Sequence, residues 1–220
     1  MNYSAVIFDL DGTLLDTLDD LADSCNRVLE DAGLSSHPVG QYRYFVGDGL
    51  STLITRILPE SLRDEKHIEE LGKAFRKDYS ANWKVKTRQY EGIDAMLNSL
   101  QGMSFSMNVL SNKPHEFTEI CVQDFFSNWS FDVILGQKAG LAKKPDPAGA
   151  LDIARTIKVP PAKVLYVGDT ATDMQTAVAA GMYPIGALWG FRTEDELRTN
   201  GAQLLIEDPR ELVQWLSKEV

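Results

Sequence analysis

The chain has little positive charge, few cysteines and no long apolar run. Its 22 lysine and arginine residues face 32 aspartate and glutamate residues, which gives a formal net charge of -10 at pH 7. A surface of that sign repels nucleic acids and anionic lipids, and no local basic patch offsets it. No apolar stretch is long enough to span a bilayer, and no basic, apolar leader opens the chain. We therefore expect a cytoplasmic protein with no nucleic-acid or membrane partner.

Cysteine and histidine are too scarce to predict a site of their own. The two cysteines, Cys25 and Cys121, are far apart and lie in amphipathic helical patterns, so we expect buried, reduced thiols rather than a disulfide. The three histidines share no metal-ligand spacing and are expected at the surface.

The most informative feature present is a pair of acids that follows the first apolar strand. The segment AVIFDLDGTLLDT, residues Ala5–Thr17, runs from that strand into Asp9 and Asp11. Neighbouring carboxylates repel, and one takes up a proton unless a bound cation supplies the opposing charge. Hard carboxylate oxygens suit Mg²⁺, whose coordination is completed by water and substrate phosphate. For this motif alone, a strand that merely ends in an acidic turn is the alternative.

Three later segments each carry a polar residue at the end of a strand or in a stiff loop. They are FSMNVLSNKP (Phe105–Pro114), KKPDP (Lys143–Pro147) and KVLYVGD (Lys163–Asp169). The polar residues that they place, together with the following turn, are Ser111, Lys144, Asp169 and Asp173. Ligands of open parallel sheets gather beyond the carboxyl ends of the strands, so we expect these residues to converge on one crevice with the first two acids.

This order of motifs resembles the haloacid dehalogenase superfamily of aspartate-nucleophile phosphatases. Its four motifs correspond to DLDGT, Ser111, Lys144 and GDTATD, and the resemblance spans nearly the whole chain. Within the superfamily, DLDGTLLDT, LSNKP, KPDP and ALWGFRTEDEL are most similar to phosphoglycolate phosphatases and their close relatives. Asp11 favours phosphoryl transfer over carbon–halogen cleavage, because a dehalogenase proper lacks an acid at that position.

The resemblance implies a Mg²⁺-dependent phosphatase that acts on a small phosphorylated metabolite, a phosphoglycolate-like monoester. Asp9 would attack phosphorus to form an aspartyl phosphate, and Asp11 would serve as general acid and base. Mg²⁺ would be held by Asp9, by the backbone carbonyl of Asp11 and by Asp169, with Asp173 steadying the ion through water. An acid in the first turn of a helix is also stabilised by the helix dipole alone, which is the alternative for Asp173.

The predicted phosphate site consists of Ser111, Asn112 and Lys144. Ser111 offers a hydroxyl or backbone donor at a strand end, and Lys144 offers an ammonium that also offsets the carboxylates. A strand-end hydrogen bond and a solvated loop lysine are the respective alternatives. Lys143 replaces Lys144 if the loop register differs.

Helical periodicity separates a cap from a strand–helix core. Apolar residues recur at helical spacing from Leu18 to Ala32, from Leu50 to Leu58 and from Ile68 to Trp83. Strands then alternate with helices, and they are expected at Met107–Ser111, Val133–Gly136, Val164–Gly168, Tyr183–Leu188 and Gln203–Ile206. We predict an α/β fold with a Rossmann-like parallel-sheet core and helices on both faces (residues 1–15 and 87–220), with an inserted α-helical cap at residues 16–86.

The cap is expected to decide which ester is cleaved. The glycine-bearing segment Tyr42–Leu50 is predicted to be a turn between helices that reaches the leaving group. Arg43 or Lys113 could pair with a substrate carboxylate. Trp189–Arg192 either borders the site, as the resemblance implies, or packs on the core as an aromatic turn.

Other functions remain open at this point. A phosphomutase of the β-phosphoglucomutase type would return the phosphoryl group to a sugar, and a pyrophosphatase or nucleotidase could use the same scaffold. A regulatory protein on an inactive scaffold is disfavoured because the key acids and Lys144 are intact. The sequence does not determine the oligomeric state, for which we expect a monomer or a weak homodimer.

Overall fold

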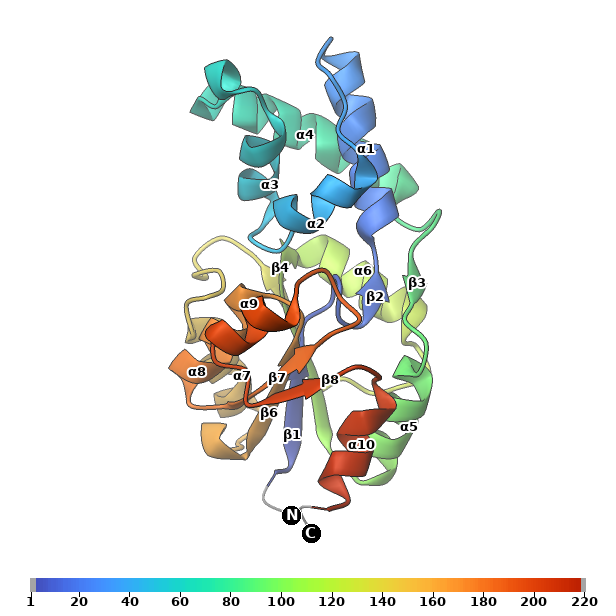
Figure 1. Cartoon of the computed structure of the whole chain (residues 1–220), viewed down its shortest axis with the longest axis vertical. Helices are drawn as coiled ribbons and strands as arrows, with labels where there is room; N and C mark the ends of the chain where they lie inside the picture. Colours follow the sequence, from blue (N-terminus) through green and yellow to red (C-terminus); the bar gives the residue numbers. More distant parts are fainter. Residues whose placement is uncertain (1–2, 219–220) are drawn as a thin grey trace.

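A six-stranded sheet forms the centre of the computed structural model, which describes residues 3–218 (Figure 1). Its spatial order is β5-β4-β1-β6-β7-β8. The strands are β1 (Ala5–Phe8), β4 (Ser106–Pro114), β5 (Val133–Gln137), β6 (Val164–Gly168), β7 (Tyr183–Ala187) and β8 (Leu204–Ile206). Every neighbouring pair is parallel. The predicted α/β fold with a Rossmann-like parallel sheet is therefore confirmed.

Helices cover both faces of this sheet. Alternate residues of β1 face opposite sides, so Val6 and Phe8 belong to one apolar cluster while Ala5 and Ile7 belong to another. The first cluster includes residues of α5 (Ile93–Gly102), α6 (His115–Phe125) and α10 (Arg210–Leu216). The second includes residues of α7 (Ala148–Thr156) and α8 (Ala171–Ala180), and α9 (Glu194–Thr199) lies beside α8 and β7. The fully buried central strands read as unbroken apolar runs for this reason.

Four helices between β2 and β3 share an apolar cluster, which also includes Phe117 and Phe191 from the rest of the chain. They are α1 (Leu18–Asp31), α2 (Tyr42–Phe45), α3 (Leu50–Ile57) and α4 (Glu65–Asn82), and they lie beyond the carboxyl end of the sheet (Figure 1). Short 3₁₀ turns occupy Val39–Gln41, Glu60–Leu62 and, in the core, Pro161–Lys163. The periodic stripes predicted α1, α3 and α4 to within a few residues.

Two local predictions need correction. The segment Tyr42–Leu50 is not a continuous turn, because Tyr42–Phe45 forms α2 and buries Tyr42 against α1. The strand predicted to end at Ser111 continues to Pro114, with a register shift after Leu110. Polar residues in that extension are buried by the cap and the neighbouring loops, which local polarity does not reveal.

Both cysteines are buried and free, as predicted. None of the helices within residues 3–218 has the length and apolar character needed to cross a membrane.

A two-stranded antiparallel ribbon marks where the chain leaves the core and returns. It pairs β2 (Leu15–Asp16) with β3 (Arg88–Gln89), and an ion pair of 2.6 Å joins Arg88 to Asp16. Strands of two residues carry no detectable sequence pattern, so this ribbon was not predicted. We propose that the ribbon divides the core, residues 1–15 and 87–220, from the helical cap, residues 16–86.

Asp20 fixes the returning chain to the first cap helix. Its buried carboxylate accepts backbone hydrogen bonds from Val85, Lys86 and Thr87 at 2.8–3.0 Å, and also accepts the Thr87 hydroxyl at 2.7 Å. One side chain on α1 therefore accepts hydrogen bonds from the backbone amides of three consecutive residues of the returning chain.

Replacing this carboxylate should destabilise the fold. We expect Asp20→Ala to lower the free energy of unfolding by about 2–3 kcal/mol, because buried backbone donors would lose their acceptor. Urea denaturation measures the change, and Asp31→Ala at the exposed end of α1 is the control, with an expected change within about 0.5 kcal/mol. Equal effects for the two variants would contradict this role of Asp20.

Candidate active site

The carboxyl ends of three adjacent strands bring the predicted site residues together. Asp9 follows β1, Ser111 lies near the end of β4, and Asp169 follows β6. Because β4, β1 and β6 are neighbours in the sheet, their ends meet at one edge. Lys144 and Asp173 reach the same place from the loop after β5 and from the first turn of α8.

Asp9, Asp169 and Asp173 form a buried carboxylate cluster. Each contributes an oxygen atom that lies within 4.8 Å of the other two. Burial raises the pKa of Asp9 to about 7, with further contributions from Asp173 and Asp11 and an opposing one from Lys144. Burial, followed by the charges of Asp173 and Asp9, raises the pKa of Asp169 well above its usual range. The cluster therefore holds more negative charge than its surroundings compensate.

Lys144 is the cation that contacts this cluster. Its Nζ lies 3.0 Å from Asp9 Oδ1 and 2.6 Å from Asp173 Oδ1, and the side chain is only 2% exposed. Burial disfavours the charged form, but Asp173 and Asp9 outweigh it and raise the pKa of Lys144 well above its usual value. The other oxygen of Asp173 accepts the Thr170 hydroxyl at 2.7 Å within a capping box of α8. Asp173 thus orients Lys144 and is itself oriented by its helix.

Asp169 is held by Thr13 of the DLDGT motif and by Phe191 of the segment Trp189–Arg192. One oxygen accepts the Thr13 hydroxyl at 3.0 Å, and the other accepts the Phe191 backbone amide at 2.8 Å. A Cβ at Gly190 would lie 2.2 Å from Asp169 Cβ, and one at Gly12 would lie 2.3 Å from Asp169 Oδ2. The segment Trp189–Arg192 therefore borders the site, because only glycine leaves room for this carboxylate. In the sequence, the glycine of DLDGT, Gly12, is the residue that could have indicated this close packing.

Asp11 lies beside the cluster, but its carboxylate contacts Lys113 rather than Lys144. It accepts hydrogen bonds from Lys113 Nζ at 3.0 and 3.3 Å. Lys113 also donates to the hydroxyl of Tyr79 on α4 at 2.8 Å, and its side chain is 3% exposed. The two acids of DLDGT thus form ion pairs with two different lysines, Asp9 with Lys144 and Asp11 with Lys113.

Ser111 and Asn112 lie between these two lysines. Ser111 lines the cavity described below, and its Oγ accepts the Lys113 amide at 3.3 Å. The side chain of Asn112 binds the backbone of Lys144 through both its amide and its carbonyl, at 3.1 and 2.9 Å. It also donates to the Gly47 carbonyl at 3.1 Å. Asn112 therefore fixes the lysine loop against the cap, and its role toward phosphate stays a prediction.

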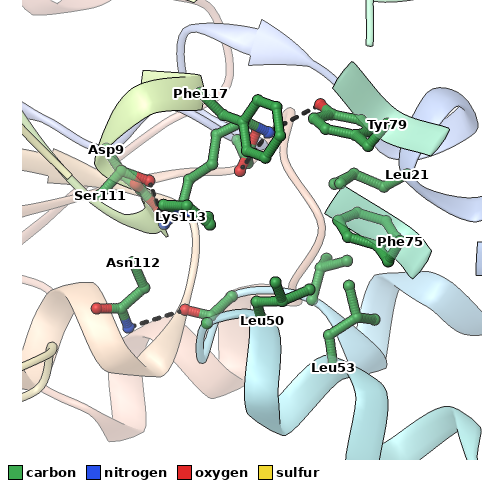
Figure 2. A pocket seen from close by; sticks show the side chains of 15 residues that line it. Asp9, Leu21, Leu50, Leu53, Phe75, Tyr79, Ser111, Asn112, Lys113 and Phe117 are labelled. Atoms are coloured by element: carbon green, nitrogen blue, oxygen red, sulfur yellow. Dashed lines mark hydrogen bonds and ion pairs between the residues drawn. The ribbon is translucent and has the colours of Figure 1, made fainter. Parts of the chain in front are cut away.

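A cavity of about 50 Å³ opens between the sheet edge and the cap (Figure 2). Asp9, Asp11, Ser111, Asn112 and Lys113 provide its polar wall. The segment between β2 and β3 contributes an apolar wall formed by Leu21, Val46, Leu50, Leu53 and Phe75, while Pro114, Phe117 and Tyr79 lie beside Lys113. Phe75 and Tyr79 belong to the apolar stripe between Ile68 and Trp83, and helical spacing alone does not show which members of a stripe border a cavity.

Of the two cations considered for the leaving group, only Lys113 lines this cavity. Arg43 instead donates to the Gly190 carbonyl at 3.3 Å. The turn after α2 contributes Val46, Gly47 and Gly49 to the lining, and the approach of this segment to a leaving group stays a prediction. Lys143 donates to the Asp48 carbonyl and the Thr52 hydroxyl, so it does not replace Lys144 in the cluster.

The donor set fits a hard divalent cation. Carboxylate oxygens within one small region are the ligands that Mg²⁺ prefers, and burial first and the neighbouring acids second raise the pKa values of Asp9 and Asp169. The side chain of Asp11 is not part of this set, and the contribution of its backbone carbonyl to a metal site stays a prediction.

Comparison with known proteins identifies relatives across nearly the whole chain. Residues 6–187 match the family model described as haloacid dehalogenase-like hydrolase. A phosphoglycolate phosphatase of Psychrobacter arcticus is 30% identical over 224 residues, covering 99% of this chain and 97% of the relative. One of Aquifex aeolicus is 30% identical over 215 residues, covering 98% and 97%. A solved structure from Lactobacillus delbrueckii subsp. bulgaricus superposes with a TM-score of 0.91 at 29% identity, covering 98% of this chain and 99% of that one.

The metal-free protein should lose stability as pH rises. Asp9 and Asp169 ionise near 3.8 in the unfolded chain but only at higher pH in the folded one, so above that value the folded state holds more protons. The free energy of unfolding then falls as pH increases through about 7. We expect Mg²⁺ to raise the melting temperature more at about pH 8 than at about pH 5, measured by calorimetry against a chelator. A rise of equal size at both pH values would contradict this, as would its persistence in Asp169→Asn.

Proposed function

Because the chain belongs to the haloacid dehalogenase-like hydrolase family, we propose that it is a Mg²⁺-dependent phosphatase that cleaves a small phosphorylated metabolite through an aspartyl phosphate. The observation that carries the proposal is the position of Asp9, which lies within the carboxylate cluster, beside Lys144, and at the wall of a cavity. The relatives from Psychrobacter arcticus and Aquifex aeolicus are named phosphoglycolate phosphatases, so phosphoglycolate is the first substrate to test.

The reaction demands contributions from several groups at once. Monoester hydrolysis can require accelerations approaching the order of 10²¹, equivalent to roughly 28 kcal/mol of barrier. A positioned general acid supplies only about 10²–10⁴ of this. Fixed charge, oriented donors and division of the reaction into two covalent steps must provide the rest.

Asp9 is oriented for nucleophilic attack. Its Oδ1 accepts the Leu10 amide at 2.7 Å and lies 3.0 Å from Lys144 Nζ, so the carboxylate cannot rotate freely. Attack on phosphorus would form the aspartyl phosphate and break the ester bond. Lys144 and Ser111 would bind the phosphoryl oxygens beside it. When bound by Asp9, Asp169 and the backbone of Asp11, Mg²⁺ would supply positive charge to a phosphoryl oxygen.

Asp11 would serve the leaving group. Its carboxylate lines the cavity and is held by Lys113, apart from the cluster that contains Asp9. From this position it would protonate the departing alkoxide and later accept a proton from the water that hydrolyses the aspartyl phosphate. The apolar cap residues would exclude other water during these steps.

Two variants test this division of roles through phosphate release. We expect Asp9→Asn to reduce turnover to background, because the amide is not a nucleophile for phosphorus. Asp11→Asn should retain Mg²⁺ binding and lose about 10²–10⁴ in turnover. Asp152→Asn, in an exposed ion pair on α7, is the control and should match the wild type.

The outcomes of this assay separate the alternatives. Release of phosphate that a chelator does not diminish would contradict the metal dependence. Isomerised hexose phosphate without free phosphate would replace the phosphatase by a phosphomutase. Full turnover by Asp9→Asn would remove Asp9 from the role of nucleophile.

A further inference from the structure

The turn between α2 and α3 carries Asp48 between two glycines that line the cavity. Gly47 and Gly49 have φ values of 108° and 86°, in the left-handed region that glycine favours. Asp48 itself is not part of the lining, and its carboxylate contacts neighbouring helices instead. The position of Asp48 therefore determines where this part of the cavity wall lies.

Core side chains donate hydrogen bonds to three consecutive carbonyl groups of this turn. The bonds run from Arg192 to Val46 at 3.1 Å, from Asn112 to Gly47 at 3.1 Å and from Lys143 to Asp48 at 2.8 Å. The donors belong to the loop after β7, the end of β4 and the loop after β5. Figure 2 shows the bond that Asn112 donates. Every residue has a carbonyl group, so these bonds hold the backbone of the turn whatever its side chains.

The carboxylate of Asp48 connects a cap helix with a core helix. Its Oδ1 accepts the Thr172 hydroxyl of α8 at 2.8 Å, and its Oδ2 lies 2.6 Å from Arg56 Nη2 of α3. Arg56 also donates to the Phe45 carbonyl at 3.0 Å, so it holds the end of α2 together with the turn. Burial raises the pKa of Asp48, but Thr172 and Arg56 outweigh burial and hold this pKa below its usual value. The acceptor is therefore charged at neutral pH, and hydrogen bonds to charged groups contribute more than those between neutral groups.

Thr172 belongs to the turn of α8 that also orients the buried lysine of the site. The residue is 8% exposed and precedes Asp173, whose Oδ1 lies 2.6 Å from Lys144 Nζ. Hydrogen bonds between a hydroxyl and an oxygen acceptor span only about 2.5–3.0 Å. The bond from Thr172 to Asp48 therefore forms only when the cap turn and the first turn of α8 lie in this relative position.

We propose that Asp48 is a positioning residue, which through the Thr172 hydroxyl holds the cap turn Val46–Gly49 in place as a wall that confines the leaving group. This inference rests on the proposed function, because that function places a leaving group on the cap side of the cavity. Asp48 touches neither the phosphoryl group nor the reacting atoms. Its contribution is to the binding of the ester, and the chemical step depends on other residues.

A matched pair of variants at Thr172 tests the proposal. Thr172→Val removes the hydroxyl at similar shape, and Thr172→Ser keeps it. We expect Thr172→Val to raise KM for phosphoglycolate by about 3- to 10-fold, the range for one hydrogen bond, with kcat within about twofold of the wild type. Thr172→Ser should restore KM. Thr156→Val removes an exposed hydroxyl that bonds within α7, and this control should match the wild type.

Inorganic phosphate separates the position of the turn from support of the phosphate site. Phosphate has no leaving group, so its inhibition constant should be the same in Thr172→Val as in the wild type. A threonine that only supported Asp173 and Lys144 would weaken phosphate inhibition and lower kcat together, and that result would overturn the proposal.

A double variant tests whether the two residues act through one contact. Asp48→Ala should raise KM at least as much as Thr172→Val. Adding Thr172→Val to Asp48→Ala should change KM by less than about twofold, because the shared bond is already absent. Multiplication of the two single effects would overturn the proposal.

Hydrogen exchange of the ligand-free protein distinguishes this inference from the proposed function. Amides of residues 46–50 should exchange about 3- to 10-fold faster in Thr172→Val and at the wild-type rate in Thr172→Ser, with α5 unchanged in both. Faster exchange in a protein that hydrolyses no phosphomonoester would refute the phosphatase and retain Asp48 as the residue that positions the turn. Hydrolysis with an unchanged KM in Thr172→Val would refute the role of Asp48 and retain the phosphatase.

Discussion

The site depends on the repulsion among three carboxylates that the fold buries within 4.8 Å of one another. One ammonium, that of Lys144, lies among them, and burial together with mutual repulsion raises the pKa values of Asp9 and Asp169. Hydrogen bonds to Asp169 and Asp173 hold these carboxylates in place against the repulsion. Gly12 and Gly190 leave the room that the Asp169 side chain needs. A divalent cation bound by these carboxylates would offset their charge. Stability, metal affinity and nucleophile position are therefore expected to change together in this protein.

A second lysine–aspartate pair distinguishes the side of the site that faces the cap from the side at the sheet edge. Lys144 forms an ion pair with Asp9 on the side where phosphate would bind, and Lys113 forms an ion pair with Asp11 on the side that faces the cap. The extended end of β4 connects the two sides, because Asn112 holds the Lys144 loop while the next residue, Lys113, reaches Tyr79. The two lysines that contact the acids of DLDGT are thus connected through one strand.

Much of this could be predicted from residue patterns, and the failures have identifiable causes. Buried parallel strands read as apolar runs, and acids at their ends predicted which side chains meet at the sheet edge. The ribbon of β2 and β3 is too short to leave a pattern. The extension of β4 consists of polar residues that are buried only by tertiary contacts. The preference of the Asp11 carboxylate for Lys113 and the packing of Gly190 against Asp169 join residues far apart in the sequence, and no local rule detects them. The chemical roles of the site residues remain predictions.

The central claim is that the carboxylate cluster binds one divalent cation. Anomalous diffraction from crystals soaked in Mn²⁺, which prefers similar oxygen ligands, tests it most directly. The account predicts a single strong peak in contact with the carboxylates of Asp9 and Asp169. A peak bound to other residues, or no peak in crystals whose cluster is accessible to solvent, would contradict it.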